Sequence, residues 1–162
     1  MQQVLMNKLF EYIRENNPDL LLELQDEERV TVYLSDKVKS ILHIVEQLNQ
    51  EGKPDYIIEE NCMDILTKDL LPSRFNYICS ILQEEFEKDY KQFIETGLLQ
   101  FEAINMLKHC QPVFEDLKFS EENEDNQFLR HAVTGGIAEY LKTKEANENM
   151  SNELQQSKET GG

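Results

Sequence analysis

Apolar residues recur three and four positions apart along most of the chain, and this spacing predicts amphipathic helices. Leu5, Leu9 and Ile13 fall on one side of the first predicted helix, which Asn17 and Pro18 end. Because proline fits the first position of a helix, a second, short helix is predicted to begin there.

The segment from Arg29 to Leu48 fits two patterns. Its start, RVTVYL, alternates and is rich in β-branched side chains, as in a strand. Over the whole segment, however, the apolar positions keep a helical period for about five turns. We therefore predict one long helix that ends at Gly52, since glycine commonly follows the last helical turn.

The same period predicts helices over residues 56–71, 75–96 and 98–110, a further turn at 112–117, and a last ordered helix from about Asn126 to Lys142. The aromatic side chains predicted to lie in the core are Phe75, Phe86, Tyr90, Phe93 and Phe101. Residues 144–162 are polar with almost no apolar anchors, so they predict a C-terminal tail without fixed structure.

These elements predict an all-α fold. Residues 1–143 would form a single domain of about six or seven helices, packed as two helical hairpins with flanking N- and C-terminal helices. The apolar pattern of residues 41–56 recurs in residues 86–101, which leaves an internal duplication open. Two antiparallel helix pairs of similar length would align equally well by chance.

The stretch GGIAEYLKT, residues 135–143, differs from a phosphate-binding loop because Leu141 stands where such a loop has its second glycine. Such a loop also follows a strand, whereas an acidic loop and about two turns of helix precede this stretch. The apolar stripe here contains Phe128, Leu129, Ala132, Val133, Gly136, Ile137, Tyr140 and Leu141. We therefore interpret Gly136 as a close-packing position that lets another backbone approach.

The net charge of the chain limits the kinds of molecule that it can bind. Asp and Glu number 32 against 16 Lys and Arg, for a net charge of -16. Such a chain repels nucleic-acid backbones and favours a basic protein partner. The candidate contact surface is the acidic run Glu121, Glu122, Glu124 and Asp125. A sharper alternative is that acidic side chains imitate DNA and block a nucleic-acid enzyme.

Residues that could carry chemistry are scattered. His43, His109 and His131 lack the spacing of helical metal ligands, and the 3 cysteines do not make a disulfide framework. We therefore predict no metal, no cofactor and no catalytic residue. A small-ligand site or an unrecognised enzyme is the alternative left open, with a pocket between helices that uses His131, Tyr140 or Cys110.

No apolar run is long enough for a signal peptide or a membrane span, so we expect a cytoplasmic protein that does not contact a membrane.

Three stretches, taken in order, carry a family resemblance: LFEYIRENNPDLL (9–21), RFNYICSILQEEF (74–86) and AVTGGIAEYL (132–141). Together they resemble a family of small helical proteins from Bacteroidetes that is catalogued as domain of unknown function family 1896. The resemblance covers about Met6 to Lys142. It implies an all-helical fold and a tendency to travel with mobile elements, and it brings no activity, cofactor or catalytic residue.

The sequence therefore favours a non-enzymatic, acidic protein-interaction module with a link to mobile elements. Apolar stripes on helices also favour self-association, so a homodimer is left open.

Overall fold

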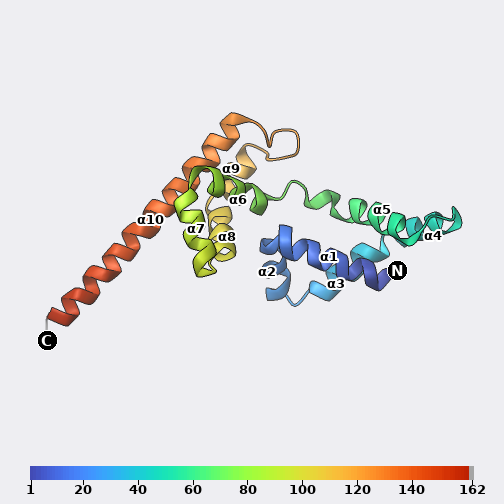
Figure 1. Cartoon of the computed structure of the whole chain (residues 1–162), viewed down its shortest axis with the longest axis horizontal. Coiled ribbons are helices and arrows are strands. Elements are labelled where there is room, and N and C mark those ends of the chain that lie inside the picture. The colour runs from blue at the N-terminus through green and yellow to red at the C-terminus, as the bar shows by residue number, and fades with distance from the viewer. Residues whose placement is uncertain (161–162) are drawn as a thin grey trace. The chain divides into compact units, whose positions relative to one another are not determined.

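The structure is a computed structural model that describes the backbone of residues 1–160 and the side chains of residues 1–156. The described chain contains ten α-helices, one short 3₁₀ helix and no strand, which confirms the all-α prediction but exceeds the predicted number of helices (Figure 1). The elements are α1 (Gln2–Asn16), α2 (Pro18–Asp26), α3 (Val30–Lys39), α4 (Leu42–Gln50), α5 (Asp55–Thr67), η1 (Lys68–Leu70), α6 (Arg74–Glu85), α7 (Glu87–Thr96), α8 (Leu99–His109), α9 (Gln111–Asp116) and α10 (Gln127–Thr160).

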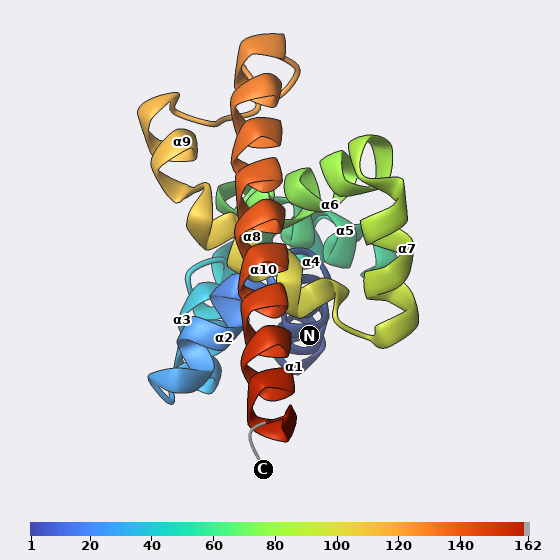
Figure 2. The same cartoon turned by 90° about the vertical axis from the view of Figure 1, so that its left-hand side faces the viewer.

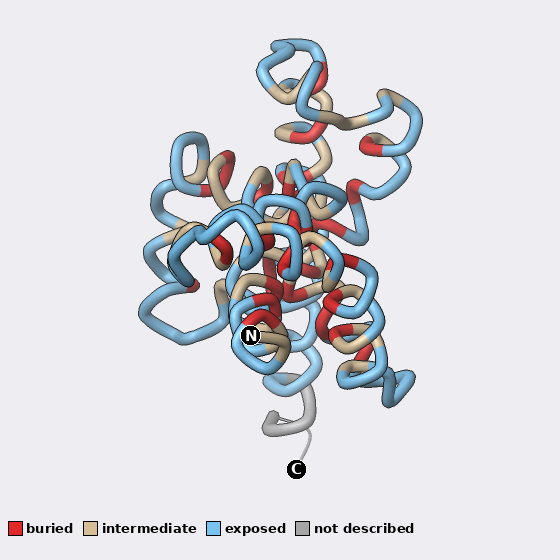
Figure 3. Tube along the Cα trace, turned by 90° about the vertical axis from the view of Figure 1, so that its right-hand side faces the viewer, coloured by how far each residue is buried: buried red, intermediate tan, exposed pale blue. Residues whose placement is uncertain are grey.

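The helices form two compact units, Met1–Tyr77 and the chain from Ile78 onward, with the boundary inside α6. In the first unit, α1 packs against α2, α3 and α5. Its fully buried side chains include Leu5, Leu9 and Ile13, at the spacing that predicts this helix. Buried and exposed positions alternate around α1, α2, α3 and α5 of this unit in the way an amphipathic pattern requires (Figure 3). The internal duplication stays a prediction.

Two predicted long helices are each divided in the structure. Residues 30–48 form α3 and α4, which meet at Ser40 and Ile41, where the Ser40 hydroxyl donates to the Lys37 carbonyl at 2.6 Å. Residues 75–96 form α6 and α7, separated at Phe86, whose φ of -132° and ψ of 52° leave the helical region. The single-helix predictions were wrong because an apolar stripe reports which side is buried and continues across a bend in the backbone.

The predicted helix ends at glycine are confirmed. Gly52 and Gly97 have φ values of 74° and 72°, in the left-handed region that side chains with a Cβ rarely adopt. At Gly97 the turn is closed because the Leu98 amide donates to the Phe93 carbonyl at 2.8 Å. The strand alternative for residues 29–34 is wrong, since α3 is a helix from Val30.

In the second unit, α10 packs against α8 and α9, and α7 packs against α8 (Figure 2). Leu129, Val133 and Ile137 are buried on one side of α10. Phe128, which the sequence places in the same stripe, is 70% exposed. It lies about 100° around the helix from Leu129, so it faces away from the packed side.

Helix α10 continues to Thr160, well beyond the predicted end at Lys142. The segment 144–160 is polar, but about half of its residues are Glu, Lys, Gln or Ala, which are strong helix formers, and it contains no glycine or proline. Because the segment has few apolar residues, no apolar period predicts a helix there, although the helix forms. Residues 161–162 of the predicted tail lie outside the described residues. No helix of the described chain is long and apolar enough to cross a membrane.

Gly136 lies against a side chain rather than against a second backbone. A Cβ built at Gly136 would lie 2.7 Å from the Sγ of Cys110, closer than real side-chain contacts allow. Cys110 is fully buried, and its thiol lies 3.8 Å from the Val133 carbonyl oxygen, which limits where the sulfur can move. A Cβ built at Gly135 would have open space around it, so of the two glycines only Gly136 makes a close contact.

We predict that Gly136→Ala destabilises the protein by about 1 kcal/mol. Overpacking costs about 1–3 kcal/mol, and the better helix propensity of alanine offsets about 1 kcal/mol of this cost. Urea unfolding followed by circular dichroism measures the change.

The matched test is the same substitution in a Cys110→Ala background. With the sulfur removed, Gly136→Ala should become neutral or stabilising, so the sign of the effect reverses. An equal loss of stability in both backgrounds would show that the Cys110 contact is not the cause.

Candidate functional site

The acidic loop, residues 120–126, is held by the side chain of Asn123. Its Oδ1 accepts the Ser120 amide at 2.8 Å, and its Nδ2 donates to the Leu117 carbonyl at 2.8 Å and to the Lys118 carbonyl at 3.1 Å. Asn126 Oδ1 accepts the Leu129 amide at 3.1 Å and so caps the start of α10. The loop therefore has a defined backbone although its sequence is almost entirely polar.

The candidate contact residues lie on this loop with their carboxylates toward solvent. Glu121, Glu122 and Asp125 are exposed and Glu124 is half-buried. None of the four forms an ion pair within the described part of the chain. Phe128 follows on the first turn of α10 with 70% of its surface exposed. The acidic loop and Phe128 together form a charged surface with one large apolar side chain.

A second cluster lies between α8 and α10 and is centred on Glu102, whose exposed fraction is only 3%. The Tyr140 hydroxyl donates to one carboxylate oxygen of Glu102 at 2.7 Å, and the Lys144 ammonium donates to the other. The Lys144 Nζ also lies 4.9 Å from the centre of the Phe93 ring, a cation–π distance. Both oxygens of the buried carboxylate thus have partners from α10.

The electrostatics of this cluster favour a structural role. Burial, followed by the hydrogen bond to Glu102 and the charge of Glu102, raises the pKa of Tyr140 to about 12. A tyrosine in this state is a neutral hydrogen-bond donor at neutral pH and a poor general base. The cluster therefore fastens α10 to α8 and fixes the register between the two helices.

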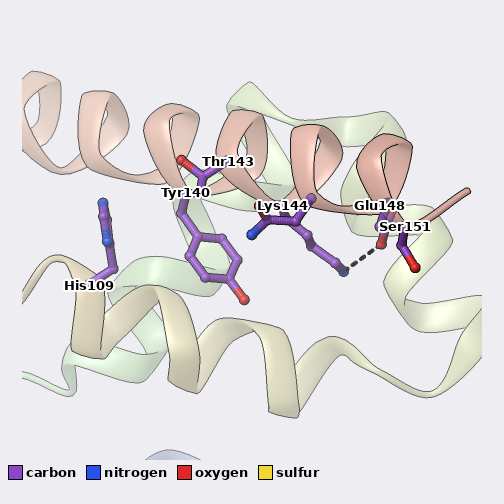
Figure 4. Close-up of a pocket in the computed structure, with 7 residues that line it drawn as sticks. His109, Tyr140, Thr143, Lys144, Glu148 and Ser151 are labelled. Atoms are coloured by element: carbon purple, nitrogen blue, oxygen red, sulfur yellow. Dashed lines mark ion pairs between the residues drawn. The ribbon is translucent and has the colours of Figure 1, made fainter. Parts of the chain in front are cut away.

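A groove of about 370 Å³ runs beside this cluster (Figure 4). His109, at the end of α8, lies on one side of it, with its ring centre 6.0 Å from that of Tyr140. The other lining residues all come from α10: Tyr140, Thr143, Lys144, Asn147, Glu148 and Ser151. Of the three residues predicted to serve a pocket, only Tyr140 lines this groove. His131 is exposed, and Cys110 is buried against Gly136.

The cysteines are poorly suited to nucleophilic chemistry. Burial raises the pKa of Cys79 to about 11, and burial together with the charge of Glu139 raises the pKa of Cys110 to about 11. Burial also raises the pKa of Cys62. These thiols stay protonated at neutral pH, whereas the reactive form is the thiolate. Among the described residues, no three His, Cys, Asp or Glu side chains group as metal ligands.

The chain matches the family model described as domain of unknown function DUF1896 over residues 5–147. The chain belongs to the DUF1896 family. No curated protein and no solved structure matches it. The matched range contains the acidic loop, Phe128, Glu102, Tyr140 and Lys144, and it ends within α10.

In this DUF1896 chain, the sequence pattern did not predict Glu102 as a buried residue, because it assigned the buried position to its neighbour. Phe101 is predicted as a core residue but is 61% exposed, while Glu102 beside it is buried. Hydrophobicity alone favours the opposite choice. A signal for the true arrangement exists in the spacing of Tyr140 and Lys144, which lie one helical turn apart and can serve one acceptor together.

We predict that Tyr140 makes stability depend on alkaline pH. The tyrosine titrates near its ordinary value of 10.0 in the unfolded chain but near 12 in the folded protein. Below the lower value both states keep the proton. As the pH rises from about 10 to about 12, only the unfolded chain releases it, so the folded state loses stability. Urea unfolding across this window should show a steeper loss for the wild type than for Tyr140→Phe.

Glu102→Gln provides the matched control, because it removes the charge and keeps an acceptor. The pKa of Tyr140 should then fall towards 10, measured as phenolate absorbance after subtracting the Tyr140→Phe spectrum. A tyrosine that titrates identically in both proteins would contradict the Glu102 contact.

Proposed function

We propose that this chain is a non-enzymatic interaction module that binds a basic segment of a protein partner through the acidic loop and Phe128. The observation that carries the proposal is Phe128, a large aromatic side chain that is 70% exposed on the first turn of α10, immediately after the acidic loop. Exposed aromatic side chains are enriched at protein interfaces, where they supply most of the binding energy.

The loop is also organised before any partner binds. Asn123, in the middle of the loop, holds the start of the loop through three hydrogen bonds, and Asn126 caps α10 where the loop ends. Binding then costs less conformational entropy than it would for a loose acidic segment. The net charge of -16 adds long-range attraction for a basic partner and speeds its association.

The location of the protein, its link to mobile elements and the imitation of DNA each rest on a separate argument. A cytoplasmic location follows from the sequence expectation, and a link to mobile elements rests on the family resemblance. Imitation of DNA needs carboxylates gathered on one face. Exposed acidic residues also occur on the first unit, at Glu28 and Glu60 for example, so this version has less support than a local acidic contact.

The groove beside Tyr140 supports a second candidate function, the binding of a small polar molecule. Its volume of about 370 Å³ suits such a ligand, and it presents a hydroxyl, an amide and an imidazole from Thr143, Asn147 and His109. It lacks a buried polar group that is free to bind, because Glu102 is already held by Tyr140 and Lys144.

We predict that a true partner binds the wild type and not Phe128→Ser. Partners are captured from an extract of the source cells at low and at high salt. Phe128 is exposed, so its substitution removes the apolar contact while the fold is kept. The double variant Glu121→Gln/Glu122→Gln should weaken the same complex by about tenfold and reduce its salt dependence, because two charge contacts are lost.

The matched control is Glu46→Gln/Glu60→Gln, which removes the same charge from two exposed positions in the first unit. If both double variants weaken binding equally and Phe128→Ser binds like the wild type, the partner responds to net charge alone, and this result would overturn the proposed contact surface.

A further inference from the structure

We infer that the basic segment of the partner is a helix, and that this helix packs across the outer side of α10 at Gly135. The inference rests on the proposed function, because it describes how the contact continues from the acidic loop and Phe128 along α10. Figure 2 shows α10 at the front of the second unit, with no other described helix of that unit over its outer side. This side is therefore open to a partner.

The outer side of α10 next to the acidic loop consists of Phe128, His131, Gly135 and Glu139, all of them exposed. They follow one another at steps of three and four residues, so they fall within about 80° of arc around the helix. The side that packs against α8 and α9 is turned away from them. The stretch from Phe128 to Glu139 is about 16 Å long, which is enough for one helix to cross.

Gly135 interrupts this row of side chains without a reason inside the described chain. A Cβ built at Gly135 meets no atom within 4 Å, and the backbone there is not in the left-handed region that favours glycine. Gly136 differs, because its missing Cβ makes room for Cys110. Glycine is, after proline, the least favourable residue in the middle of a helix. A residue that breaks such a local rule without a gain for the fold is expected at a functional surface.

The gap that Gly135 leaves suits a helix. Side chains three and four residues apart form ridges on a helix, and two helices pack by placing a ridge of one into a groove of the other. In the row on α10, the missing side chain leaves a gap between His131 and Glu139, where a second backbone can approach closely. Phe128, two turns before Gly135, would pack against the flank of the same helix.

The charges at both ends of this row favour a basic helix. At one end, the four carboxylates of the acidic loop form no ion pair within the described part of the chain. At the other end, the Glu139 side chain is 72% exposed and lies 3.8 Å from the Nε2 of His109. Lys142 follows on the same side and is exposed. It would repel a basic helix, so the contact should end before it.

The binding of two synthetic peptides to the full chain tests the inference, measured by titration calorimetry at low salt. One peptide is an amphipathic helix of about 20 Leu, Ala and Lys residues, and the other carries a proline at its centre, which breaks the helix. The helical peptide should bind the wild type about tenfold more tightly than the proline peptide. Gly135→Gln should weaken binding of the helical peptide by about tenfold, because the new side chain fills the gap. The same substitution should raise the urea midpoint of unfolding, because glutamine is the better helix former.

The matched control is Ala146→Gln, which places the same side chain on the same side of α10 beyond Lys142 and should leave binding unchanged. Equal binding of the two peptides, or no binding of either, overturns the inference. A lower urea midpoint for Gly135→Gln would show that the fold itself needs this glycine, which overturns it as well.

Phe128→Ser separates this inference from the proposed function. If Phe128→Ser weakens binding of the helical peptide and Gly135→Gln does not, the acidic loop and Phe128 remain the contact surface, and the helix across Gly135 is overturned. If neither substitution changes the binding, the proposed contact surface is overturned together with the inference.

Discussion

The carboxylate of Glu102 constrains the second unit more than any other group. A buried charge without partners costs several kcal/mol, so the helix that covers α8 must bring donors to both oxygens of this carboxylate. Tyr140 and Lys144 do so from one face of α10, a single turn apart. Their position fixes how far α10 is shifted along α8. The same register places Gly136, one turn earlier, against Cys110, where only the absence of a Cβ permits the approach.

Helix α10 in turn connects the features that could bind partners. At its start, Asn126 caps the helix and ends the acidic loop, so Phe128 is presented on the first turn. At its centre, Tyr140 and Lys144 hold it to α8. Beyond them, the core-facing side continues to Leu154 in solvent. Because a helix is stiff over this length, the register set at Glu102 also sets the direction in which the exposed side faces.

The sequence predicts the helices and several of their ends, because those depend on local rules. Pro18 begins α2, and Gly52 and Gly97 take the left-handed conformation that ends a helix. The bends at Ser40 and Phe86 were missed because the apolar period passes through them unchanged. The exchange of Phe101 and Glu102 was missed for a different reason. It depends on donors from a helix distant in sequence, which no local pattern contains.

The candidate surfaces were predictable to different degrees. The acidic loop is visible as a run of charges, but its rigidity depends on Asn123, whose contacts only the structure shows. The polar C-terminal segment predicts a tail because it has few apolar residues, although two of those few, Met150 and Leu154, lie one turn apart. The DUF1896 match ends at residue 147, so the acidic loop and the Glu102 cluster lie within it while Leu154 lies beyond. A function that depends on the matched range would therefore draw on the loop and the fixed α8–α10 pair rather than on the exposed end of α10.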